Sequence, residues 1–206
     1  MDTEAFWRVL GAAKDRDKPL DAAVTDRLSA LRPEEILAFE YEFSRLRDAV
    51  HRWDVWAAAY LIGGGCSDDR FSDFTAGLVA LGREWYERVA AHPDALAGHP
   101  AVRTAAAVGD QDVIFDEDFN FVSCRAYERL TGDTDAFWGA SETYIAARTT
   151  SANDGSEGDD GDVDMGESFD FDDAKQMRLR LPRLASLYAH SSPTCGVAGA
   201  NRPPAR

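Results

Sequence analysis

Apolar side chains recur at every third or fourth position along most of the first 150 residues, and this spacing predicts helices with one buried face. The longest unbroken run consists of Ile36, Phe39, Phe43, Leu46 and Val50. Pro33 precedes it, where a proline suits the first helical turn. Shorter runs predict two earlier helices, over residues 2–14 and 20–31.

The middle of the chain continues the pattern. Residues 53–62 are apolar and rich in aromatic side chains, and they lead into three consecutive glycines. A strong stripe from Phe71 to Val89 then predicts one continuous helix. The pattern weakens after residue 93, where VIFDEDF at residues 113–119 predicts a brief extended piece.

Helical spacing returns in residues 121–131, which a glycine closes, and again in residues 136–148. Residues 151–168 are acidic with almost nothing to bury, which predicts a disordered linker. Residues 169–188 predict a C-terminal helix packed on the domain, with a kink or a late start at Pro182.

The domain organisation follows from these segments. Residues 1–148 form a helical domain, and residues 189–206 are expected to be a disordered tail. The predicted fold class is all-α, a compact bundle of about six to eight helices with irregular connections.

The chain is strongly acidic, with 22 basic and 37 acidic residues and a formal net charge of −15. Residues 1–150 alone carry 16 basic and 27 acidic groups, a net of −11. This charge disfavours nucleic acid and anionic membrane surfaces, because both repel carboxylates. It suits solubility or a basic protein partner. The oligomeric state does not follow from the sequence.

Three widely spaced cysteines, Cys66, Cys124 and Cys195, form neither a disulfide framework nor a zinc motif. The acidic N-terminus lacks the basic residues of a signal peptide. No apolar run approaches the roughly 18 residues of a membrane span. We therefore expect a reduced, cytoplasmic protein.

The most distinctive motif is the turn after the aromatic segment, which consists of Gly64, Gly65, Cys66, Ser67, Asp68 and Asp69. One explanation is structural: the glycines end one helix, and Ser67 or Asp68 caps the next. The other is a functional site. A Walker loop is excluded, because no Lys-Ser or Lys-Thr follows the last glycine.

Two kinds of chemistry remain for this turn. Cys66 lies near a predicted helix N-terminus, which lowers the pKa of a thiol, but the adjacent aspartates oppose a thiolate. Asp69 and Asp73 share a helical face that suits magnesium, a spacing that is also common on solvated faces.

The acidic stretch near residue 160 resembles a calcium loop at first sight. Met165 stands where that loop requires glycine, and Phe171 stands where it requires glutamate. The sequence therefore predicts no metal site and no cofactor.

Aromatic residues offer a candidate lining for a ligand, made of Trp53, Trp56, Tyr60 and Tyr86. Their helical spacing equally suits a hydrophobic core. Arg83 is a further candidate, either as an ion-pair partner of Asp68 or Asp69 or as the anchor of an anionic ligand.

These residues together resemble the uncharacterised bacterial domain-of-unknown-function (DUF) 4240 family. The shared features are a Trp-Asp-x-Trp-x-Ala-Ala-Tyr helix from Trp53, the Gly-Gly-Cys-Ser-Asp-Asp turn, and a Gly-Arg-x-x-Tyr-Glu helix from Gly82. The resemblance spans most of residues 1–132. It implies a small, mostly helical protein, with a hint of a regulatory role, and it transfers no catalytic residue.

We expect an acidic, cytoplasmic, helical module that binds or regulates a protein, an immunity-type inhibitor of a toxin included. One alternative is an enzyme, or a small-ligand or metal-binding domain, with its site at the Gly64–Asp69 turn and Arg83. Another is a structural part of a larger assembly. The sequence favours a non-enzymatic role and leaves any catalytic residue unknown.

Overall fold

The computed structural model describes residues 1–13, 17–133, 135–152 and 164–188. All regular structure in these ranges is helical, which confirms the all-α prediction. The helices are α1 Thr3–Ala12, α2 Leu20–Leu28, α3 Pro33–Ala49, α4 Trp53–Gly63, α5 Asp68–Ala80, α6 Arg83–Ala91, η1 Pro93–Gly98, α7 Pro100–Val108, η2 Asp118–Phe121, α8 Val122–Thr131, α9 Asp135–Ala152, α10 Ala174–Arg180 and α11 Pro182–Tyr188, where η marks a 3-10 helix. They outnumber the predicted six to eight, because two predicted helices are each divided and because η1, α7 and η2 form where the apolar pattern is weak.

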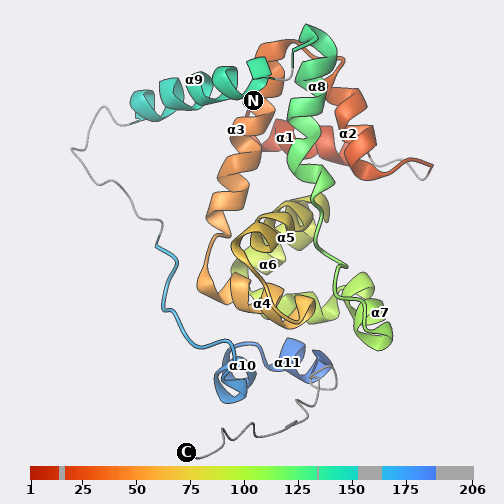
Figure 1. The fold of residues 1–206 in the computed structure, drawn as a ribbon, viewed down its shortest axis with the longest axis vertical. Coiled ribbons are helices and arrows are strands. Elements are labelled where there is room, and N and C mark those ends of the chain that lie inside the picture. The colour runs from red at the N-terminus through yellow and green to blue at the C-terminus, as the bar shows by residue number, and fades with distance from the viewer. Residues whose placement is uncertain (14–16, 134, 153–163, 189–206) are drawn as a thin grey trace, which may run out of the picture.

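Helix α3 is the axis of the fold (Figure 1). Helices α1, α2 and α8 gather around its N-terminal half, and α4, α5 and α6 lie at its C-terminal end. One hydrophobic core runs through both groups, and its fully buried phenylalanines include Phe6, Phe39, Phe43, Phe71, Phe74 and Phe119. A smaller cluster of Leu37, Cys124 and Phe137 holds α9 against the body.

The single helix predicted from Phe71 to Val89 is wrong, because the chain turns at Gly82. Gly82 has a φ of 94°, a backbone conformation that glycine adopts readily and other residues avoid. Helix α6 starts directly after it and packs Tyr86 on Trp7 of α1, with ring centroids 5.4 Å apart. The apolar stripe continues across the break because both helices face the same core.

The extended piece predicted over residues 113–119 is also wrong. Residues 109–117 form an irregular loop, here called the crossing loop, which lies across α5 and leads into η2. The Asp116 N–H donates to the Asp73 carbonyl oxygen at 3.1 Å. The Ile114 carbonyl oxygen lies 1.6 Å from the position that a Cβ would take at Gly77. The loop can approach α5 so closely only because Gly77 has no side chain.

The C-terminal part of the chain lies against α4 and η1 (Figure 1). It begins with residues 164–173, here called the strap, which have no regular secondary structure. Two short helices follow instead of one, since Pro182 starts α11 as a new helix. Their buried side chains, which enter the main core, are Met177, Leu181, Leu184 and Tyr188.

The linker predicted over residues 151–168 differs from the structure at both ends. Helix α9 continues to Ala152, and residues 164–168 belong to the strap. The rest of the predicted linker, residues 153–163, and the predicted tail, residues 189–206, lie outside the described residues.

Candidate functional site

The predicted turn joins α4 to α5, and both helices are capped within it. Gly64 ends α4 with a φ of 62°, and its N–H donates to the Tyr60 carbonyl oxygen. Ser67 is the N-cap of α5, because its hydroxyl accepts a hydrogen bond from the Arg70 N–H at 3.4 Å. Of the two capping candidates, Ser67 therefore has that role, and Asp68 is the first residue of the helix.

Backbone conformation and packing together explain the three glycines, since Gly64 and Gly65 have positive φ angles of 62° and 132°. A Cβ at Gly63 would lie 2.9 Å from the Phe115 ring, and a Cβ at Gly64 would lie 2.5 Å from the side-chain nitrogen of Gln111. Both neighbours belong to the crossing loop. The turn is therefore shaped to receive this loop.

The Cys66 thiol is half-buried rather than presented to solvent. Burial, with the nearby charges of Asp68 and Asp73, raises its pKa to about 11. The Cys66 carbonyl oxygen accepts a hydrogen bond from the Trp56 indole N–H at 3.1 Å. A thiol in these surroundings stays protonated at neutral pH, so it is a poor nucleophile.

The raised pKa predicts slow alkylation of Cys66. A change from 9.0 to about 11 lowers the thiolate fraction at pH 7.5 about 100-fold, since each pKa unit is tenfold. In a chain carrying Cys124→Ala and Cys195→Ala, iodoacetamide should therefore modify the folded protein about 100-fold more slowly than the same chain in denaturant. Equal rates for the folded and unfolded chains would contradict this prediction.

The remaining residues of the predicted site do not converge. Asp68 and Asp69 lie on the exposed side of the first turn of α5, where a negative charge favours the helix dipole. Arg83 lies on α6 and pairs with Glu4 of α1 at 2.6 Å and with Glu87 at 2.7 Å. The expected pairing of Arg83 with Asp68 or Asp69 is therefore wrong, because the break at residue 82 directs α6 toward α1.

Arg70, rather than Arg83, is the arginine that joins the start of α5 to the crossing loop. Its guanidinium lies over the Phe115 ring, 4.1 Å from the centroid. It also donates to the Asp112 carboxylate at 2.9 Å and to the Gln111 carbonyl oxygen at 3.1 Å. Sequence reasoning missed Arg70, because all three partners come from the crossing loop about forty residues later in the chain.

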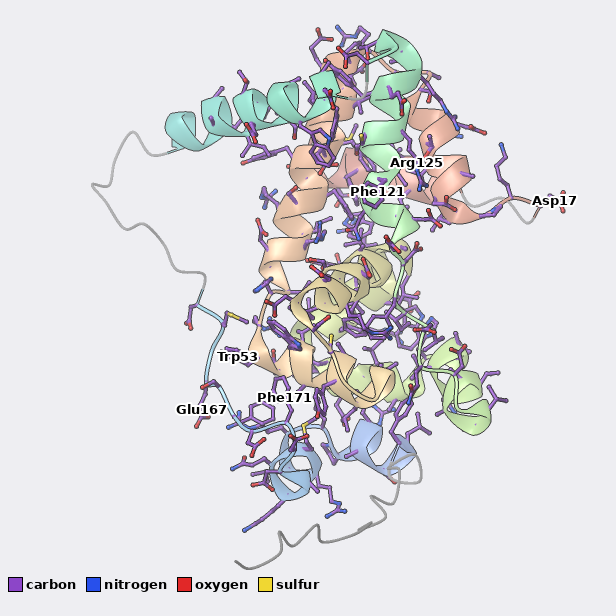
Figure 2. The ribbon with its side chains drawn as sticks, viewed as in Figure 1. Asp17, Trp53, Phe121, Arg125, Glu167 and Phe171 are labelled. Carbon is purple, nitrogen blue, oxygen red and sulfur yellow. The ribbon has the colours of Figure 1, made fainter. Side chains whose placement is uncertain are left out.

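Three of the four residues predicted to form an aromatic lining lie together on α4. The rings of Trp53 and Trp56 stack 5.6 Å apart, and Trp56 stacks on Phe71 of α5 at 4.4 Å. Tyr60 and Trp53 both contact Phe171 of the strap, which lies beside α4 in Figure 2. We call the side chains of Trp53, Trp56 and Tyr60 the aromatic face.

Tyr86 does not belong to the aromatic face. Its hydroxyl donates to the Leu46 carbonyl oxygen at 2.7 Å, and burial raises its pKa to about 12. It is a core residue that joins α6 to α3.

A concentration of negative charge lies where α5 meets the crossing loop. This acidic surface is made of Asp68, Asp69, Asp73, Asp112, Asp116, Glu117 and Asp118. Burial and, after it, the negative charge of Glu117 raise the pKa of Asp73. Among the described residues, Arg70 pairs with Asp112 and Arg125 pairs with Asp118, so negative charge remains in excess.

A second group of charges lies inside the protein, between α3, α5 and α8. Burial raises the pKa of Glu40, although Ser123 and Arg47 partly oppose the shift. Arg47 itself donates to the Thr75 hydroxyl at 3.2 Å. Nothing in the sequence distinguished Glu40 from the exposed glutamates of the same helix.

The raised pKa values of three partly buried carboxyls predict greater stability in mild acid than at neutral pH. Because the pKa values of Glu40, Asp73 and Asp116 are raised, the folded state holds their protons more tightly than the unfolded chain does. Their contribution is complete below the ordinary carboxyl pKa of about 4 and is lost as the pH rises through the folded-state values. These three carboxyls should therefore lower the melting temperature as the pH rises above about 4. His99, whose pKa burial lowers, acts in the opposite direction below its ordinary pKa of about 6.5.

Glu40→Gln provides the residue-level check. It should raise the melting temperature at pH 7 and flatten the pH dependence, while Glu34→Gln on the exposed start of α3 should change neither. A melting temperature that climbs steadily with pH would overturn the prediction.

Within the described residues, no group of three or more histidine, cysteine, aspartate or glutamate side chains is arranged to hold a metal ion. None of the described helices is long and apolar enough to cross a membrane.

The model of one protein family, described as a protein of unknown function (DUF4240), matches residues 1–129. This match confirms the resemblance seen in the sequence. No curated protein and no solved structure matches the chain. The turn, the aromatic face and the acidic surface lie within the matched part, whereas α9, the strap, α10 and α11 lie outside it.

Proposed function

The chain belongs to the DUF4240 family, and we propose that it is a protein-binding module whose acidic surface receives a basic partner. The observation that carries this proposal is the excess of carboxylates over paired arginines where α5 meets the crossing loop. Complementary charge accelerates association and selects the partner. The net charge of residues 1–150 acts in the same direction over longer distances.

The turn supports this role as a scaffold. The Ser67 hydroxyl is engaged as a cap and the Cys66 thiol is held protonated, so neither is poised for covalent chemistry. Asp68 and Asp69 are the residues that it presents to solvent. The turn therefore fixes the start of α5, and with it the placement of two carboxylates at the edge of the acidic surface.

The proposed setting is the reduced cytoplasm, with which the free thiols of Cys66 and Cys124 agree. A regulator of a basic protein, or an inhibitor that neutralises a basic toxin, would use a surface of this kind. Both roles require binding and no catalysis.

The test compares two sets of substitutions in the full-length chain, each of which removes three negative charges. Asp68→Asn, Asp69→Asn and Glu117→Gln remove three exposed carboxylates of the acidic surface. Glu34→Gln, Asp48→Asn and Glu142→Gln form the matched control, since they remove three exposed carboxylates from α3 and α9.

Each chain is used to isolate partners from a lysate of the source organism, and any protein retained is then purified and its Kd measured at two salt concentrations. We expect a basic protein that binds the wild type and the control set alike, loses affinity for the acidic-surface set, and weakens steeply with salt. Equal affinity for all three chains, or binding that salt leaves unchanged, would refute the proposal.

A further inference from the structure

The strap lies along the aromatic face without regular secondary structure, and it ends in a turn in which the Asp173 N–H donates to the Asp170 carbonyl oxygen at 3.3 Å. The Met165 carbonyl oxygen accepts a hydrogen bond from the Trp53 N–H at 3.0 Å, so the strap caps the start of α4 in place of a side chain. At its other end, the Asp172 carboxylate accepts a hydrogen bond from the Tyr60 hydroxyl. Between these points Phe171 contacts Trp53 and Tyr60, with ring centroids 6.1 and 5.5 Å apart.

The strap's two aromatic residues lie side by side. Phe169 comes just before the turn at residues 170–173, and Phe171 lies in it. Their rings are 5.1 Å apart, and both pack against the main core while remaining partly exposed. The strap thus combines a backbone hydrogen bond to α4 with two neighbouring aromatic side chains.

The attachment of the strap is much weaker than that of the helices that follow it. Leu181 and Leu184 are almost completely buried, and the Asp94 carboxylate accepts hydrogen bonds from the Arg183 and Leu184 N–H groups. No strap residue is fully buried. Segments with few buried contacts open at lower free-energy cost than the core does. The strap can therefore leave the aromatic face while α11 stays in place.

Charge also opposes the docked strap. Its ten residues carry five acidic groups, Asp164, Glu167, Asp170, Asp172 and Asp173, and no basic group. The domain beneath it is itself acidic, so attractive contacts must hold the strap against net repulsion. These are the aromatic contacts, the two hydrogen bonds and Arg180 of α10, which pairs with Glu167 at 2.8 Å and lies over the Phe169 ring, 4.3 Å from its centroid. Tethering at both ends of the strap compensates, because it keeps the local concentration high.

We propose that the aromatic face is a docking surface for a partner protein's acidic segment with two aromatic side chains two residues apart, and that the strap is its built-in, displaceable occupant. The strap itself indicates the chemistry of this partner. The aromatic face lies within the part of the chain that the family model matches, and its cover lies outside that part. This surface is separate from the acidic surface, so a second class of partner can bind there.

The probe is a fluorescein-labelled peptide with the sequence of residues 164–175, DMGESFDFDDAK, and binding is followed by anisotropy. The full-length wild type is compared with the full-length variant Phe169→Ala/Phe171→Ala, in which the strap loses its aromatic contacts. We expect the variant to bind the peptide at least about tenfold more tightly, because its face is no longer occupied. Adding Tyr60→Phe to the variant should weaken binding again.

Two controls define specificity. A peptide in which both phenylalanines are alanine should not bind. Binding of the probe should strengthen as salt is raised, since salt screens the repulsion between peptide and domain. This salt dependence is opposite in sign to that expected for the basic partner, so the two proposals can fail independently.

Hydrogen exchange of the wild type tests the opening of the strap without any substitution. The Trp53 amide, which donates to Met165, should exchange through a local opening, well before the Leu184 amide in the anchored helix. Equal exchange of the two amides would overturn the proposal. So would an unchanged peptide affinity in the variant, or equal binding of the peptide with both phenylalanines replaced. Exchange of straps between two copies of the variant would also overturn it.

Discussion

Replacing Gly77 by alanine is expected to destabilise the protein by about 3 kcal/mol, the upper end of the usual cost of overpacking. The new Cβ would lie 1.6 Å from the Ile114 carbonyl oxygen and 2.7 Å from its carbonyl carbon. Both atoms belong to the backbone, so no side-chain rotation relieves the contact. The crossing loop would have to move away from α5 as a unit.

That displacement would reach beyond the point of contact. The loop also carries Phe115 and Gln111, which lie over the glycines of the turn, and the Asp116 N–H that bonds to Asp73. Chemical unfolding in urea measures the loss of stability directly. Separation of the crossing loop from α5 should also increase the rate of hydrogen exchange of the Asp116 amide.

The matched control for Gly77→Ala is Gly11→Ala. Gly11 lies inside α1 with no atom within 4 Å of the added Cβ. There the substitution should stabilise the protein by about 0.5–1 kcal/mol, because glycine is less favourable than alanine in a helix interior. Helix propensity alone predicts the same gain at both positions. If Gly77→Ala also stabilised the protein, the close approach of the crossing loop would be wrong.

Local features of the fold were predictable from the sequence. The stripe in α3 contains a buried face at helical spacing, and Gly132 ends α8 in the left-handed conformation that a C-terminal glycine suggests. Ser67 and Asp68 were both candidates for the N-cap of α5, and the structure shows that Ser67 has this role. Each of these features depends on residues within one or two helical turns of each other.

Features that depend on distant segments were not predictable. The break at Gly82 leaves the apolar stripe intact, because α5 and α6 turn the same kind of face toward one core. Besides Glu87 on its own helix, Arg83 pairs with Glu4, on a different helix 79 residues earlier in the chain. Single-sequence periodicity contains no information about which segments meet, so both were assigned wrongly.

The candidate site shows the same division. The turn could be recognised from its residues, yet its role depends on the crossing loop, whose position no local pattern indicates. The acidic surface was visible in the sequence only as net charge, since its members come from α5 and from a loop about forty residues away. The strap was partly assigned to a disordered linker, because its contacts with Trp53 and Tyr60 are more than a hundred residues distant in the chain.

Replacing Asp94 by alanine should cost about 2 kcal/mol, the second-largest effect expected from a single substitution. Helix α11 begins at Pro182, and its free N–H groups have no capping side chain of their own. The Asp94 carboxylate supplies the cap from η1, accepting from the Arg183 N–H at 3.1 Å and from the Leu184 N–H at 2.9 Å. Hydrogen bonds to a charged group contribute about 1.5–3 kcal/mol, and the charge also favours the helix N-terminus.

Asp94→Asn separates the charge from the hydrogen bond, because the amide oxygen still accepts while the negative charge is lost. Urea unfolding should therefore rank the wild type above Asp94→Asn and Asp94→Ala lowest. Asp48→Asn on the exposed end of α3 controls for the general gain from removing one negative charge in an acidic protein.

Since Asp94 holds α11 while the strap is held by aromatic contacts, Asp94→Ala should accelerate hydrogen exchange at Leu184, and Phe171→Ala should accelerate it at Trp53. If either substitution affected both amides equally, the strap and α11 would form one cooperative unit, and the strap could not open on its own.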